Sequence, residues 1–74
     1  MRPIKIFEIG PGTGILAQSI IEFMKNYSHS NKLEYHLIEI SEMLCKNVLS
    51  KRFENEKGVS INIHNKSIFE YNDK

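Results

Sequence analysis

The segment KIFEIGPGTGILAQSI, residues 5–20, decides the fold, because it joins a strand, a glycine turn and the start of a helix. Residues 4–9 are apolar enough to predict a strand, and the glycines at 10, 12 and 14 favour a turn that lets a ligand approach the main chain closely. Apolar residues then recur at helical spacing, which predicts a helix over 14–27 with one core-facing stripe: Leu16, Ile20, Phe23, Met24 and Tyr27.

The remainder of the chain repeats this alternation. Residues 33–40 predict a second strand, and Ser41 is well placed as the N-cap of a second helix over 42–53. Residues 59–64 alternate apolar and polar side chains, which predicts a third strand with one covered face. Apolar pairs spaced four residues apart support the second helix: Leu44 with Val48, and Leu49 with Phe53.

The element order β-α-β-α-β predicts the α/β class, with parallel strands joined by right-handed crossovers. The expected architecture is half of a doubly wound, Rossmann-like sheet with strand order 3-2-1, occupying residues 1–74 as one partial domain. In a complete sheet the first strand would have a further partner on its other side. We therefore expect half a domain whose unpaired strand edge promotes aggregation or pairing with another copy.

Composition narrows the function classes. The 74 residues have a net charge of +1, which provides no field to attract nucleic acid or anionic lipid. The single cysteine, Cys45, excludes an internal disulfide and a cysteine-based zinc motif, and His29, His36 and His64 lack metal-ligand spacing. No apolar run approaches a membrane span, and no signal or transit peptide is visible. These features predict a soluble intracellular protein without a resident metal.

The glycine turn follows the first strand, where open α/β sheets bind ligands. Pro11 removes one N–H from a phosphate cradle, and the Glu8 carboxylate would repel a diphosphate but attract a ligand with an ammonium and a sulfonium. Glu39, at the end of the second strand, is placed to accept hydrogen bonds from both ribose hydroxyls. The spacing G-x-G-x-G, followed by Ile15, also differs from the dinucleotide pattern.

Simpler structural interpretations stay open for the same residues. The glycines also suit a plain tight turn, and Glu39 also suits a solvated strand end, although the flanking acids favour the ligand-binding roles. Glu8 has Lys5 and Lys66 as alternative partners. Cys45, one turn into its helix, is either a thiol with a lowered pKa or a plain half-buried side chain, of which the second is favoured.

The stretches FEIGPGTG and LIEIS resemble motif I and the downstream acid of class I S-adenosylmethionine-dependent methyltransferases, and this resemblance runs from residue 4 to about 69. Within that superfamily, EIGPGTGILAQSIIEFM and YHLIEISEMLCKNVLSKRF are most similar to the MidA-like group. That group contains the mitochondrial complex I assembly methyltransferase, which acts on a protein arginine. Glu42 and Asn47 stand where the group often has proline and glutamine.

The resemblance implies S-adenosyl-L-methionine as methyl donor, with its methionine part over the glycines, its ammonium near Glu8 and its ribose on Glu39. Asn65, Lys66 and Ser67 occupy the region that reads adenine in such enzymes. The donor contacts it implies are Glu8, Gly10, Pro11, Gly12, Thr13, Gly14, Glu39, Ile40 and Ser67.

The resemblance also implies a protein substrate, such as a complex I subunit, and a mitochondrial location. The family's catalytic residues lie beyond the third strand, so the chain alone is expected to bind the donor without transferring its methyl group. Two alternatives stay open. One is a fragment of an NAD-dependent oxidoreductase, which the glycine spacing and Glu8 disfavour. The other is a non-catalytic assembly protein that retains the fold, which the half-sheet favours.

Overall fold

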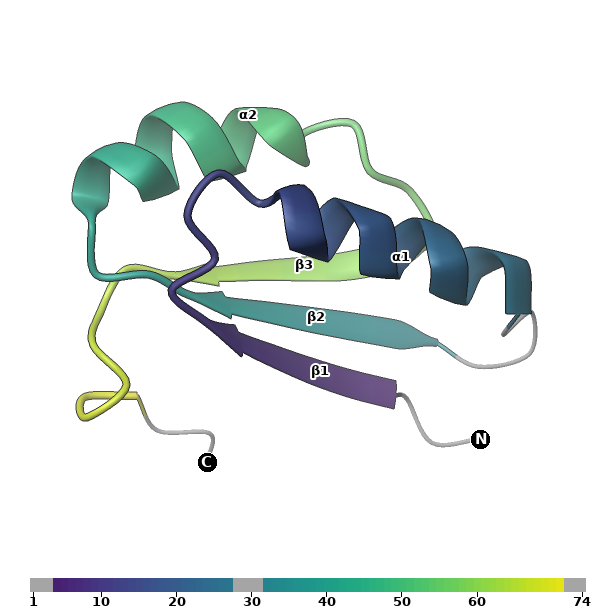
Figure 1. The fold of residues 1–74 in the computed structure, drawn as a ribbon, viewed down its shortest axis with the longest axis horizontal. Helices are drawn as coiled ribbons and strands as arrows, with labels where there is room; N and C mark the ends of the chain where they lie inside the picture. The colour runs from purple at the N-terminus through teal and green to yellow at the C-terminus, as the bar shows by residue number, and fades with distance from the viewer. Residues whose placement is uncertain (1–3, 28–31, 72–74) are drawn as a thin grey trace.

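A computed structural model describes residues 4–27 and 32–71. Strands β1 (Ile4–Ile9), β2 (Leu33–Ile38) and β3 (Val59–His64) form one parallel sheet in the order β1-β2-β3 (Figure 1). The α/β class, the parallel pairing and the strand order are therefore as predicted. Among these residues no helix is long and apolar enough to cross a membrane.

Both crossover helices lie on the same face of the sheet (Figure 1). Helix α1 (Ile15–Tyr27) connects β1 to β2, and the second helical segment includes a π-turn, η1 (Leu44–Leu49), followed by α2 (Ser50–Arg52). The Ser41 hydroxyl accepts a hydrogen bond from the Leu44 N–H at 3.2 Å, which confirms the predicted N-cap. The π-turn was not predicted. Its hydrogen-bond pattern is seen at Ser50, whose N–H donates to the Cys45 carbonyl five residues earlier.

The predicted bounds of the first and third strands are confirmed, but the second strand ends at Ile38 rather than at residue 40. The carbonyls of Glu39 and Ile40 both accept hydrogen bonds from the Asn65 side-chain amide, each at 3.1 Å. These carbonyls are thus satisfied by the loop after β3, and the chain turns away from the sheet two residues early.

The core lies between the helices and the sheet, and one part of the predicted α1 stripe is wrong. Ala17 and Ile21 are fully buried, whereas Leu16 and Phe23 are 58% and 57% exposed. Ile20 and Met24 pack partly against the core, and the Tyr27 side chain lies outside the described residues. The buried cluster is Ala17, Ile21, Leu33, Tyr35, Leu37, Leu49 and Phe53.

Polar contacts join the flank of α1 that carries Gln18 and Lys25 to the second helical segment and the turn after it. The Gln18 side chain accepts a hydrogen bond from Arg52, and the Lys25 ammonium pairs with Glu56 at 2.7 Å. These contacts hold one flank of α1 against α2 and the turn after it. On the neighbouring side of the helix, the small Ala17 side chain is fully buried in the core, where it permits close packing.

The other face of the sheet carries a row of stacked rings. Phe7 stacks on His36 with ring centroids 4.7 Å apart, and His36 stacks on His64 at 5.2 Å. Tyr71 meets the edges of Phe7 and His64 from the segment after β3. His36 also bonds to the Glu34 carboxylate at 2.9 Å. The described residues contain no group of three or more side chains that could hold a metal ion.

Candidate functional site

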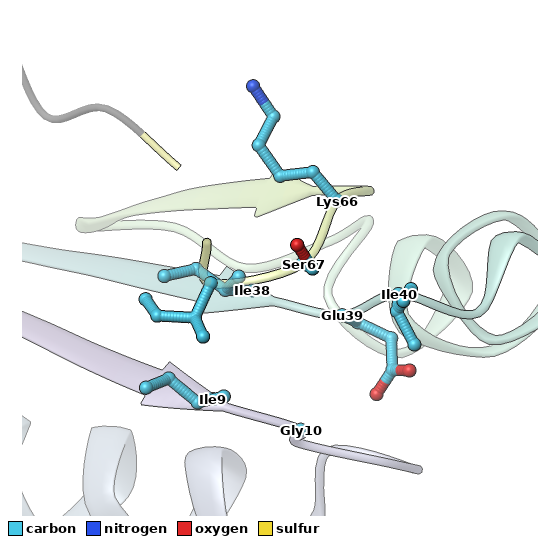
Figure 2. Close-up of a pocket in the computed structure, with 8 residues that line it drawn as sticks. Ile9, Gly10, Ile38, Glu39, Ile40, Lys66 and Ser67 are labelled. Atoms are coloured by element: carbon cyan, nitrogen blue, oxygen red, sulfur yellow. The ribbon is translucent and has the colours of Figure 1, made fainter. Parts of the chain in front are cut away.

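A cavity of about 190 Å³ opens at the carboxyl ends of the strands (Figure 2). It is mainly apolar, because four isoleucines contribute to its wall, and it would enclose only part of a ligand, since sites for drug-sized molecules run to roughly 300–1,000 Å³. Its lining comes from three chain segments: Ile9 and Gly10; Ile38, Glu39 and Ile40; Lys66, Ser67 and Ile68.

The structure gathers some of the predicted donor contacts around this cavity and leaves others outside its wall. Gly10, Glu39, Ile40 and Ser67 line it, and so does Lys66 from the expected adenine-reading region. The lining does not include the remaining predicted residues, which are Glu8, Pro11, Gly12, Thr13 and Gly14.

Three lining residues were missed in the sequence: Ile9, Ile38 and Ile68. For Ile9 and Ile38 the sequence does contain a signal, which is the alternation of side chains along the strands. In the parallel register Ile9 pairs with Ile38, and alternation places both on the face opposite the helices. Ile68 lies in a loop without periodicity, so its place depends on the tertiary fold.

Glu39 is the polar centre of the site. Its side chain belongs to a residue only 6% exposed, and its two oxygens accept hydrogen bonds from the N–H groups of Gly12 (3.2 Å) and Ser41 (2.9 Å). Figure 2 shows the carboxylate extending from the end of β2 beside the glycine turn. Glu39 is therefore not a solvated strand end. Each carboxylate oxygen still has acceptor capacity for a ligand hydroxyl.

Glu8 lies on the helix side of the sheet, because alternation along β1 separates it from Ile9. Its carboxylate accepts a hydrogen bond from the Tyr35 hydroxyl at 3.0 Å, so its hydrogen-bond partner is a tyrosine and not Lys5 or Lys66. Burial, and then the Glu8 carboxylate, raise the pKa of Tyr35 above its usual value. Glu8 thus links the side chains of β1 and β2 on the helix side of the sheet.

The three glycines of the turn differ in their surroundings. A Cβ atom on Gly10 or Gly12 would meet no atom within 4 Å, so a ligand has room to reach the backbone there. A Cβ on Gly14 would come within 2.9–3.1 Å of side chains in the second helical segment. Gly14 therefore serves helix packing, and the open backbone is that of Gly10 and Gly12.

Cys45 is buried, and its thiol donates to the Glu39 carbonyl at 3.4 Å. Burial, followed by the nearby Glu39 and Glu42 charges, raises the pKa of this thiol. Cys45 is therefore buried rather than half-buried, and the raised pKa supports the structural interpretation, because a thiolate nucleophile requires the opposite shift.

A half-sheet of this topology with a glycine turn after its first strand is the nucleotide-binding half of a Rossmann-like fold. A family model described as "Putative S-adenosyl-L-methionine-dependent methyltransferase" matches residues 1–70. The chain belongs to this family, which agrees with the methyltransferase class and the methyl donor expected from the sequence. No curated protein and no solved structure matches it significantly.

Proposed function

We propose that this chain binds S-adenosyl-L-methionine at the carboxyl ends of its strands. The observation that carries the proposal is the Glu39 carboxylate, which lies between the open glycine backbone and the cavity. A ligand that reaches from one to the other passes this carboxylate, where its ribose hydroxyls find an acceptor.

The surrounding residues fit the parts of that donor. Ile9, Ile38 and Ile40 offer apolar contacts to an adenine ring, and the Ser67 hydroxyl offers a polar one. The backbone at Gly10 and Gly12 has the room that a methionine chain requires. Glu39 supplies negative charge suited to a cationic ligand, and Glu8 adds to this charge from the helix side of β1, outside the cavity wall. Pro11 and Thr13 belong to the turn. Gly14 lets the second helical segment pack closely against the turn.

The bound donor would supply an electrophilic methyl group. For the acceptor we propose an arginine side chain of a protein, in mitochondrial complex I assembly. This rests on the similarity of residues 8–24 and 35–53 to the MidA-like group. Because the chain alone is expected not to transfer the methyl group, the acceptor is tested with a longer protein that includes this chain. That protein is incubated with radiolabelled donor and arginine-containing complex I subunits, against the same subunits with those arginines replaced by lysine.

Calorimetry with the full chain tests donor binding. We expect S-adenosyl-L-methionine to bind and NAD not to bind. Glu39→Ala should weaken binding about 10- to 100-fold, because a charged hydrogen bond contributes about 1.5–3 kcal/mol. Glu42→Ala is the matched control, since Glu42 is an exposed carboxylate that pairs with Lys46 at 2.9 Å.

Two results would contradict the proposal. Equal donor affinity in the Glu39→Ala and Glu42→Ala variants would remove Glu39 from the site. Binding of NAD in preference to the methyl donor would favour the oxidoreductase alternative. The chain alone is expected to bind the donor without transferring its methyl group, so donor binding without transfer favours the non-catalytic assembly role only if a longer protein that includes this chain is also inactive.

A further inference from the structure

The segment after β3 is joined to the end of β2 by a side chain that does not line the cavity. The Asn65 amide nitrogen donates to the main-chain carbonyls of Glu39 and Ile40, each at 3.1 Å. Both acceptors belong to residues of the cavity wall, and Lys66, directly after Asn65, begins the third lining segment (Figure 2). Asn65 therefore ties together two of the three chain segments that form the cavity.

The two acceptors explain why an amide stands at this position. A carbonyl oxygen only accepts hydrogen bonds, and the NH₂ group of asparagine has two hydrogens, one for each carbonyl. A carboxylate at position 65 has no hydrogen to donate and would face two carbonyl oxygens instead. The residue type thus matches the task of joining Glu39 and Ile40 to the loop after β3.

Glu39 is held by the end of β3 through both of its backbone polar groups. Its N–H donates to the His64 carbonyl at 2.9 Å, and its carbonyl accepts from Asn65. These two bonds orient the peptide planes on either side of the Glu39 Cα, and so they set the direction in which the side chain leaves the backbone. The carboxylate then reaches the N–H groups of Gly12 and Ser41. Asn65 therefore acts on the polar centre of the site through the main chain.

The Ile40 carbonyl depends on Asn65 more than the Glu39 carbonyl does. The Glu39 carbonyl also accepts from the Cys45 thiol at 3.4 Å, which is a weak donor. For the Ile40 carbonyl, the Asn65 amide is the hydrogen-bond partner found within residues 4–27 and 32–71. Ile40 is also 72% exposed, so packing does little to hold it. Loss of the amide should release Ile40 first, and with it one apolar wall of the cavity.

We propose that Asn65 is a positioning residue of the donor site: its amide holds Glu39 and Ile40 where they receive the ribose and the adenine, and it does not itself read the adenine amino group. This inference rests on the proposed binding of S-adenosyl-L-methionine. The cavity lining includes Lys66 and Ser67 from this segment but not Asn65, whose amide nitrogen is committed to the main chain. Positioning and ligand contact are thus divided between neighbouring residues.

Substitutions at position 65 separate positioning from recognition of the base. Asn65→Ala removes both hydrogen bonds and should weaken donor binding about 3- to 10-fold in calorimetry, since the net contribution of such bonds is modest. Asn65→Asp should bind at least as weakly, because its carboxylate repels the two carbonyls. A residue that reads the adenine amino group would show the reverse order, since a carboxylate accepts from that group. The demethylated donor, whose sulfur is uncharged, is the ligand for this comparison, so that the new charge has no sulfonium to attract.

A donor analogue without the ribose 2′-hydroxyl shows whether Asn65 acts through Glu39. The natural chain should bind the complete donor more tightly than this analogue, because Glu39 offers an acceptor to the hydroxyl. The ratio of the two affinities should shrink in Asn65→Ala. It should be unchanged in the matched control Asn62→Ala, whose amide bonds to Ser60 within β3. A general loss of stability would weaken both ligands alike and leave the ratio unchanged.

Amide hydrogen exchange tests the positioning without a ligand. The N–H groups of Gly12 and Ser41 both donate to the Glu39 carboxylate, so Asn65→Ala should speed their exchange relative to Asn62→Ala while the amides of β2 stay protected. Faster exchange in a chain that binds no donor would contradict the proposed function and support Asn65 as the residue that positions Glu39. Unchanged exchange at both amides, an unchanged affinity ratio in a chain that binds the donor, or tighter binding by Asn65→Asp than by Asn65→Ala would each overturn this inference.

Discussion

Glu39 combines a structural role with its proposed role in binding. Its carboxylate holds the glycine turn through the Gly12 N–H and the start of the second helical segment through the Ser41 N–H. The Glu39→Ala substitution should therefore lower the melting temperature as well as the donor affinity. Substitutions at Gly12 and Gly14 separate the effect on donor affinity from the effect on stability. Gly12 faces open space, whereas Gly14 faces packed side chains.

Gly14→Ala should destabilise the fold more than Gly12→Ala. Both glycines have positive φ, +87° and +59°, so each alanine adds about 1–2 kcal/mol of backbone strain. At position 14 the new methyl group also meets Leu49 at 2.9 Å, which adds about 1–3 kcal/mol of overpacking. Urea unfolding measures this difference. Calorimetry should show that Gly12→Ala lowers the donor affinity more than Gly14→Ala, because the open backbone at Gly12 is where the ligand approaches. Equal free energies of unfolding for the two variants would contradict the packing role of Gly14.

Tyr35→Phe should alter how stability depends on alkaline pH. The pKa of Tyr35 is raised in the folded chain, so the folded state keeps a proton that the unfolded chain loses above about pH 10. The stabilisation from this group is complete below that pH and decreases as the pH rises past it. Urea unfolding between neutral and alkaline pH should show a steeper loss for the natural chain than for Tyr35→Phe. Parallel curves would contradict this.

At the scale of secondary-structure elements, the second helical segment contacts the glycine turn and holds it in place. Arg52 donates from Nε to the Thr13 carbonyl and from Nη1 to the Gln18 side chain, so one guanidinium joins α2, the turn and α1. Gly14 lets the same segment pack closely against the turn. The geometry of the proposed donor site thus depends on a helix that does not line the cavity.

Arg52→Ala should therefore reduce both stability and donor affinity. The loss of two hydrogen bonds at an exposed side chain predicts a decrease of about 1 kcal/mol in the free energy of unfolding. Lys51→Ala, the neighbouring exposed cation on α2, is the matched control. Urea unfolding and calorimetry measure the two effects. If both variants behave alike, Arg52 does not position the glycine turn.

At the scale of the whole molecule, the two crossover helices cover one face of the three-stranded sheet (Figure 1). The proposed donor site lies at the carboxyl end of this sheet, where its lining comes from the ends of β1 and β2 and from the segment after β3.

The sequence by itself determined the elements and their order, because these follow from local periodicity. The alternation in residues 59–64, the glycine turn and the Ser41 cap each act over a few residues, and the right-handed crossover rule then orders the strands. The bounds of β1 and β3 were predictable for the same reason.

Only the tertiary structure decided which face of α1 is buried and what surrounds each polar group. The α1 pattern offers apolar residues on two flanks, and it is the side with Ala17 and Ile21 that packs into the core with residues of β2 and the second helical segment. Likewise, the burial of Glu39, the Tyr35 partner of Glu8 and the place of Ile68 in the cavity arise between segments far apart in the chain. Such contacts have no periodic signature, since they depend on packing in three dimensions.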